Sequence, residues 1–91
     1  MTYYLLRRYV EAIDAGVRGL SRNPGRNTQL LTHPMLAATY AELGKQQDAE
    51  HERAITARLW PLLDSRTFAD QFGTPEARAH ILEGLQKAGF R

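Results

Sequence analysis

Three residues of the chain recur at one fixed interval, and this repeat constrains the fold more than any other feature. Tyr3, Ala12 and Pro24 are followed 37 residues later by Tyr40, Ala49 and Pro61. Weaker matches at the same interval pair Leu6 with Leu43, Arg8 with Lys45, Glu11 with Asp48 and Leu20 with Ala57. Units repeated at roughly 20 to 50 residues stack on their neighbours and build binding surfaces rather than catalytic pockets. The sequence therefore predicts a repeat protein that recognises other proteins.

The second copy resembles the tetratricopeptide repeat, a helix-turn-helix unit of about 34 residues. The residues that carry the resemblance are Leu36, Ala37, Tyr40, Gly44, Ala49 and Pro61. The match is partial, because His33 and Arg53 stand where the family often has aromatic residues, and Gly16 does so in the first copy. The resemblance implies an all-α domain of antiparallel helical hairpins. It divides the chain into a truncated first repeat (1–24), a second repeat (25–61) and a C-terminal cap (62–91).

The C-terminal segment 81–90 also looks like the end of tetratricopeptide regions that follow a cyclase or DNA-binding domain in some bacterial signalling proteins. This second resemblance implies that the chain is the end of a longer protein or a truncated relative. In either case it implies a scaffold or regulatory tail without the catalytic part.

Apolar spacing predicts four principal helices and no strand. The first is expected to run from about Thr2 to Ser21 as one rod, because Arg7 takes the place that Gly44 holds in the second copy. The extra residues of the long interval are placed in the segment 25–32. Thr32 is expected to cap the next helix, with Pro34 in its first turn and Gly44 at its end.

The remaining helices carry clearer start and stop signals. One helix is expected over 46–59, and a short one is expected to follow a cap at Asp64 or Ser65. Thr74 precedes a proline and an acid, which is a typical helix start, and Gly89 is a typical helix end.

Composition restricts the compartment and the partner classes. The chain has no cysteine, no secretory leader and no run of about 20 apolar residues, so we expect a cytoplasmic protein without a membrane span. Its net charge is +2, but residues 1–26 carry five arginines against two acids. A nucleic-acid accessory module that uses this basic first helix is therefore the alternative function. A solvated helix face is the simpler explanation.

No catalytic residue, cofactor site or metal site is predicted. His51-Glu52 begins like the helix of a zinc protease, but Ile55 stands where the second histidine is required. His33, His51 and His80 lie on separate predicted segments, with no cysteine and no evident carboxylate pair. We therefore expect a chain that is not an enzyme.

Two binding surfaces are predicted. The family resemblance implies that the first helix of the second repeat lines a partner groove with Leu31, Met35, Ala38, Ala41 and Glu42, unless Leu31 and Met35 belong to the core. In the repeat register, the first helix packs inward through Tyr9, Ala12, Gly16 and Gly19. A separate apolar stripe on that helix predicts a homodimer interface made of Tyr3, Leu6, Val10, Ile13, Val17 and Leu20. The alternative is that further chain upstream covers this stripe.

Overall fold

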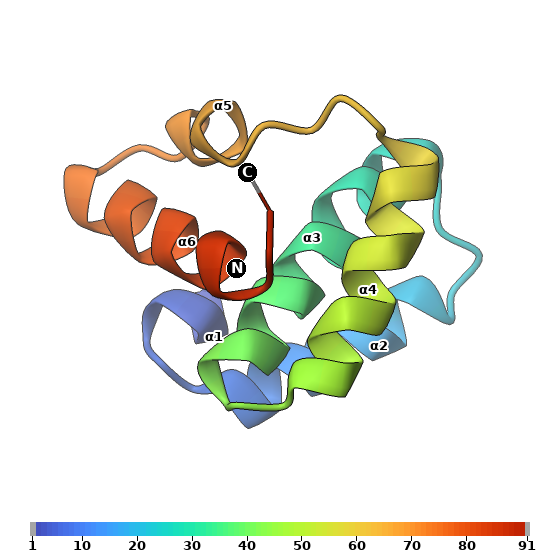
Figure 1. The fold of residues 1–91 in the computed structure, drawn as a ribbon. Helices are drawn as coiled ribbons and strands as arrows, with labels where there is room; N and C mark the ends of the chain where they lie inside the picture. The colour runs from blue at the N-terminus through green and yellow to red at the C-terminus, as the bar shows by residue number, and fades with distance from the viewer. Residues whose placement is uncertain (1, 91) are drawn as a thin grey trace.

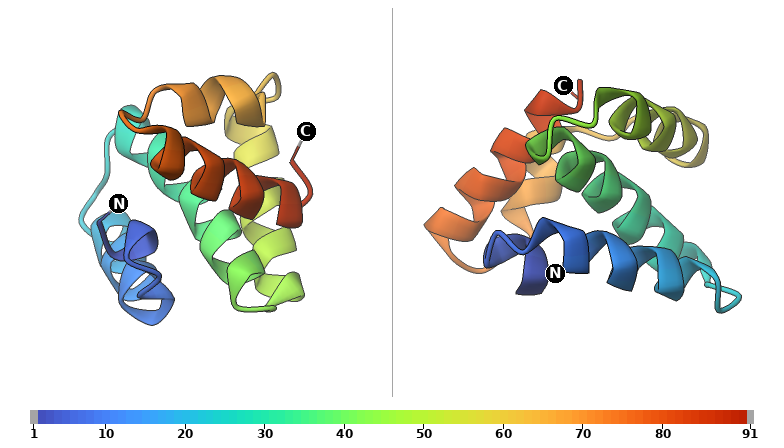
Figure 2. Two further views of the ribbon diagram at one scale, coloured as in Figure 1. Left: turned by 90° about the vertical axis from the view of Figure 1, so that its left-hand side faces the viewer. Right: turned by 90° about the horizontal axis from the view of Figure 1, so that it is seen from below.

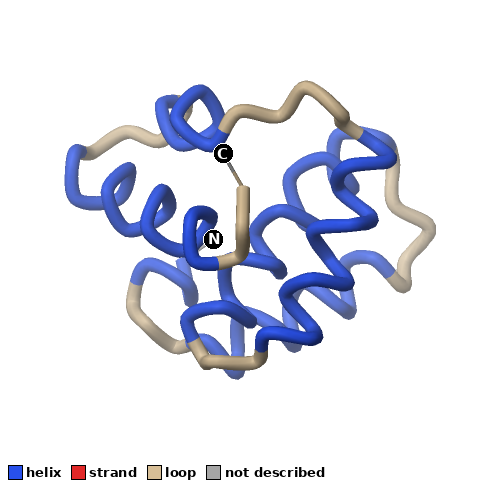
Figure 3. The backbone as a smooth tube through the Cα atoms, viewed as in Figure 1, coloured by secondary structure: helices blue, strands red, loops and turns tan. Residues whose placement is uncertain are grey.

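The computed structural model describes residues 2–90, and within them the chain forms helices and no strand (Figures 1 and 3). The all-α class predicted from the sequence is confirmed. The outer limits of the expected units, Met1 and Arg91, lie outside the described residues. The helices are α1 (Thr2–Leu5), α2 (Tyr9–Leu20), α3 (Arg26–Glu42), α4 (Gln46–Leu59), α5 (Ser65–Asp70) and α6 (Pro75–Lys87).

The expected single rod over the first 21 residues is wrong, because the chain turns at Arg7 between α1 and α2. Arg7 adopts a left-handed conformation with φ of 60°. Its backbone N–H donates to the carbonyl of Tyr4 at 2.9 Å, and the N–H of Arg8 donates to the carbonyl of Tyr3 at 2.8 Å. This pair of hydrogen bonds is the Schellman motif, which ends a helix and is usually built on glycine.

The same motif ends α3 at Gly44, which has φ of 75°. Gly44 N–H donates to the carbonyl of Ala41 at 3.0 Å, and Lys45 N–H donates to that of Tyr40 at 2.9 Å. Each donor and each acceptor lies 37 residues after its counterpart in the first turn. The repeat found in the sequence is thus also a repeat of backbone geometry, in which Arg7 takes the conformation of Gly44.

Helix α3 begins at Arg26, six residues before the cap expected at Thr32. Pro34 consequently lies inside the helix and not in its first turn. Proline has no N–H, so the carbonyl of Leu30 receives no helical hydrogen bond from it. The additional residues of the long repeat interval therefore lengthen a helix, where a loop was expected.

The C-terminal helices begin and end close to where the sequence predicts. The side chain of Asp64 accepts a hydrogen bond from Arg66 N–H at the start of α5, and Thr74 accepts one from Ala77 N–H at the start of α6. Gly89 follows α6 with φ of 97°. These caps satisfy backbone N–H groups that have no partner within a helix.

Helix α3 is the centre of the domain, since α2, α4 and α6 all pack against it. Figure 2 shows α2 and α4 on opposite sides of α3. The larger core cluster joins α1, α3, α5 and α6 through Tyr4, Met35, Ala38, Phe68, Ala69, Ile81 and Leu85. A smaller alanine cluster lies where α3 meets α4 and the end of α6, and consists of Ala37, Ala41, Ala49 and Ala88. Small side chains at these positions allow the helices to approach closely.

Candidate functional site

The apolar stripe predicted on the first helix is largely exposed. The turn at Arg7 divides it, so Tyr3 and Leu6 belong to α1 and its end, and the other members lie on α2. Leu6 is 61% exposed and Val10 is 68% exposed, and Tyr3 and Val17 are exposed as well. Ile13 and Leu20 are half-buried.

The inward face predicted for α2 is present with one exception. Tyr9 and Ala12 pack against the larger core cluster. A Cβ atom at Gly16 would lie 2.9 Å from a methyl carbon of Leu36, so glycine there allows α2 to approach α3. Gly19 is the exception, because no atom lies within 4 Å of its Cβ position. It faces open space and does not take part in the packing.

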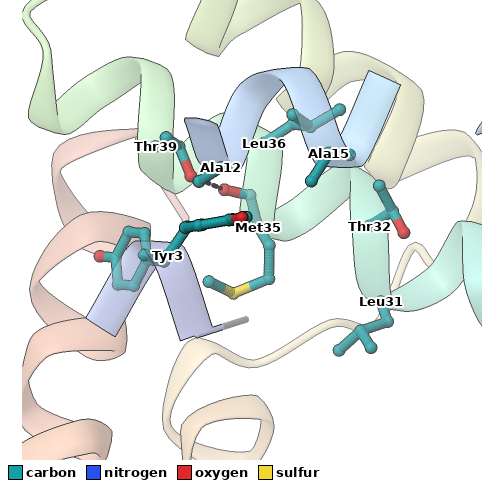
Figure 4. Close-up of a pocket in the computed structure, with 10 residues that line it drawn as sticks. Tyr3, Ala12, Ala15, Leu31, Thr32, Met35, Leu36 and Thr39 are labelled. Atoms are coloured by element: carbon teal, nitrogen blue, oxygen red, sulfur yellow. Dashed lines mark hydrogen bonds between the residues drawn. The ribbon is translucent and has the colours of Figure 1, made fainter. Parts of the chain in front are cut away.

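A pocket of about 200 Å³ lies between α1 and α2 on one side and α3 on the other. Its lining includes Tyr3, Ala12, Ala15, Leu31, Thr32 and Met35. Figure 4 shows Met35 between Tyr3 and Leu31, with the Thr39 hydroxyl donating to the backbone carbonyl of Met35. Two residues of the predicted partner groove, Leu31 and Met35, therefore border a pocket. Leu31 is exposed, whereas Met35 is almost wholly buried.

The other predicted groove residues are covered by the domain itself, so the prediction of an open groove is wrong at these positions. Ala38 packs in the larger core cluster, and Ala41 packs in the alanine cluster with Ala88. The side chain of Glu42 is only 3% exposed, and it contacts His80 of α6. The physical reason is that α6 packs along α3, where the family resemblance implies an open concave surface.

A partly buried group of polar side chains forms where α3 ends beside α6. It consists of Glu42, His80, Glu83, Lys87 and the phenols of Tyr4 and Tyr9, and we call it the polar cluster. Lys87 donates to one carboxylate oxygen of Glu42 at 2.8 Å. The Nε2 atom of His80 lies 3.3 Å from the other oxygen and 2.8 Å from the Tyr9 hydroxyl. The Tyr4 hydroxyl donates to the backbone carbonyl of His80 at 2.8 Å.

Burial and charge together shift the pKa values in this cluster. Burial acts to raise the pKa of Glu42, but the hydrogen bond from Lys87 and the nearby positive charge outweigh it, so this pKa lies below its usual range. Burial, followed by the charge of Arg7, lowers the pKa of His80. The hydrogen bond to Glu42 raises the pKa of Lys87. At neutral pH the cluster therefore contains an ionised carboxylate, a neutral imidazole and an ammonium group.

Sequence reasoning missed this cluster. Glu42, His80 and Glu83 place one potential ligand atom each within 4.8 Å of one another. His80 and Glu83 stand three residues apart and so share a face of α6, which the sequence does show. The approach of Glu42 depends on how α6 packs against α3.

The other two histidines lie outside this cluster. His33 Nδ1 lies 2.6 Å from the carboxylate of Glu52, whereas His51 is exposed.

The basic first third of the chain is partly neutralised. Arg8 pairs with Glu11 at 2.5 Å, and Arg18 pairs with Asp14. Arg7 donates to the Tyr9 hydroxyl at 3.4 Å. These contacts direct several guanidinium groups along the protein surface, which weakens the case for a surface that follows a phosphate backbone.

Comparisons with family models, with curated proteins and with solved structures give no match for this chain. The resemblance to the tetratricopeptide repeat therefore stays a prediction from the sequence. None of the helices in residues 2–90 combines the length and the apolar character that crossing a membrane requires.

Proposed function

We propose that this chain is a non-catalytic protein-interaction module, acting as a scaffold or regulatory tail, and that it binds a second copy of itself. The observation that carries the proposal is the pair of exposed valines, Val10 and Val17, on one face of α2, with the exposed Leu6 just before the turn at Arg7. Single exposed apolar side chains are ordinary on a protein surface. A row of them along one flank of a helix is typical of an interface.

The charges of α2 favour a second copy as the occupant of this surface. The first half of the helix carries Glu11 and Asp14, and Arg18 and Arg22 follow in its second half and just beyond its end. Two copies of α2 that pack antiparallel about a two-fold axis place the acidic half of each helix beside the basic half of the other. The valines then face each other across the axis. The two-fold arrangement therefore lets the apolar faces of the two helices cover each other, while Arg8–Glu11 and Asp14–Arg18 stay paired within each copy.

The test is the oligomeric state of the chain and of two matched variants. Sedimentation at about 100 μM, well above a micromolar dissociation constant, is expected to show a dimer for the unmodified chain. Val10→Glu combined with Val17→Glu should give a monomer that keeps its helical circular dichroism. Leu62→Glu is the control, because Leu62 is 90% exposed on the loop between α4 and α5, away from the stripe. A monomeric unmodified chain, or a Leu62→Glu variant that is also monomeric, would contradict the proposal.

A further inference from the structure

We propose that Glu42, His80 and Glu83 form a binding site for zinc, which joins the end of α3 to α6. The three residues offer one imidazole nitrogen and two carboxylate oxygens, and these atoms lie within 4.8 Å of one another. Imidazole combined with carboxylate suits zinc, whereas magnesium and calcium prefer oxygen ligands alone. The structure thus assigns a role to a histidine that the sequence pattern left without one.

The spacing of the two buried ligand atoms fits the metal. His80 Nε2 lies 3.3 Å from the nearer oxygen of Glu42. Ligands about 2.0 to 2.1 Å from a tetrahedral zinc ion are separated from each other by about 3.3 to 3.4 Å. Both side chains are buried, at 3% exposed for Glu42 and 8% for His80, and both are carried by long helices. They require little movement to bind an ion.

Two side chains of the site are free to move: Glu83, which is the third ligand, and Lys87, whose ammonium now pairs with Glu42. The side chains of Glu83 and Lys87 are each 51% exposed. The Lys87 ammonium lies 2.8 Å from Glu42 and 3.8 Å from Glu83, so it occupies the position of a cation between the two carboxylates. A lysine on a flexible exposed arm can swing into solvent when a divalent ion replaces it. Zinc would then take the place that the ammonium now holds between Glu42 and Glu83.

A tyrosine contact and an open coordination position complete the site. The phenols of Tyr4 and Tyr9 lie 3.4 and 3.5 Å from the Glu42 oxygen that faces His80. Tyr4 donates its one hydroxyl proton to the His80 carbonyl, so Tyr9 is the phenol that can donate to Glu42 once zinc occupies His80 Nε2. Hydrogen bonds to a metal ligand orient it and commonly change metal affinity by about 10- to 100-fold. The half-exposed side chains of Glu83 and Lys87 place one side of the site at the protein surface. Three protein ligands leave a fourth position for water.

The experiment titrates zinc into chelator-treated full chain by calorimetry, with cobalt as a spectroscopic substitute. We expect one ion per chain, a tetrahedral cobalt absorption spectrum, and no binding of magnesium. Glu83→Gln should weaken zinc binding at least about tenfold, in line with the loss of a metal-binding contact. Its partly exposed side chain makes this variant compatible with folding. Glu76→Gln is the matched control, since Glu76 lies on the same helix but outside the cluster.

A second readout is thermal. Zinc should raise the melting temperature of the unmodified chain and of Glu76→Gln by a similar amount, and that of Glu83→Gln by clearly less, because a ligand bound to the folded state stabilises it. The proposal would be overturned if zinc does not bind, or binds only with a dissociation constant above about 1 mM. Equal zinc affinities of Glu83→Gln and Glu76→Gln would also overturn it, because the ion would then be bound elsewhere.

Discussion

Replacing Gly84 by alanine should destabilise the domain, although alanine is the better helix former. Gly84 is buried in α6 and faces α1 and α3. A Cβ atom built there would overlap the hydroxyl oxygen of Tyr4 and lie 2.9 Å from the Cβ of Ala38. Optimal carbon contacts are about 3.5 to 4.0 Å. Tyr4 cannot yield easily, since it is almost fully buried and its hydroxyl donates to the His80 carbonyl.

The magnitude follows from three opposing contributions. Overpacking a closely packed core costs about 1 to 3 kcal/mol. Displacing Tyr4 would also break a buried hydrogen bond, with a net cost of about 1 kcal/mol. Alanine recovers about 1 kcal/mol over glycine inside a helix. The expected net loss is about 2 kcal/mol, which corresponds to a fall in melting temperature of about 8 to 16 °C for a domain of this size.

Thermal denaturation followed by circular dichroism measures this loss, and Gly19→Ala provides the control. Gly19 is also helical, but nothing lies within 4 Å of its Cβ position, so alanine there should stabilise the domain by up to about 1 kcal/mol. Adding Tyr4→Phe to Gly84→Ala removes the overlapping oxygen and should cost less than the two single changes combined. A Gly84→Ala protein that melts at or above the unmodified chain would refute the reasoning.

Three further substitutions test the packing and the helix ends by the same melting measurement. Ala49→Leu should cost about 1 to 3 kcal/mol, because Ala49 is fully buried between α3 and α4. Glu50→Leu, one position further and exposed, should be nearly neutral, and equal shifts would mean that the assigned helix face is wrong. Thr74→Ala should cost about 1 kcal/mol by removing the cap on Ala77 N–H, and an unchanged melting temperature would contradict that role. Gly44→Ala should cost about 1 kcal/mol through its positive φ alone, and a stabilised variant would show that the turn can reform.

The sequence predicts the C-terminal helices well because their signals are local. Thr74 and Asp64 are strong caps, and Gly89 is a typical helix end. The break at Arg7 was missed for the opposite reason, since arginine is not a residue that usually ends a helix in this way. The repeat interval nevertheless aligns Arg7 with Gly44. This alignment indicates a helix end at Arg7, although arginine itself does not.

The sequence places the start of α3 too late, because Pro34 suggests the first turn of a helix, whereas α3 begins at Arg26. Proline is common in that position. Here tertiary packing tolerates it within the helix, where the segment from Pro34 to Thr39 is buried without interruption. The packing of α3 against α2 and α6 evidently offsets one missing hydrogen bond.

The polar cluster could not be predicted because its members are far apart in sequence. Glu42 and His80 are brought together only when α6 packs against α3. The spacing of His80 and Glu83 places them on one helix face, but it does not indicate which helix that face will contact. The spacing therefore places His80 and Glu83 together but gives no reason to connect them to Glu42.

The contact between Tyr4 and His80 joins residues 76 positions apart, through a hydrogen bond and through rings stacked with centroids 4.4 Å apart. In an open array of helical repeats, each unit contacts only its neighbours, so the ends can fray while the middle stays folded. Here the first helix contacts the last one, and neither can detach without exposing a side of the other. We therefore expect unfolding to be cooperative, with amide protons of α6 exchanging at a rate set by opening of the whole domain.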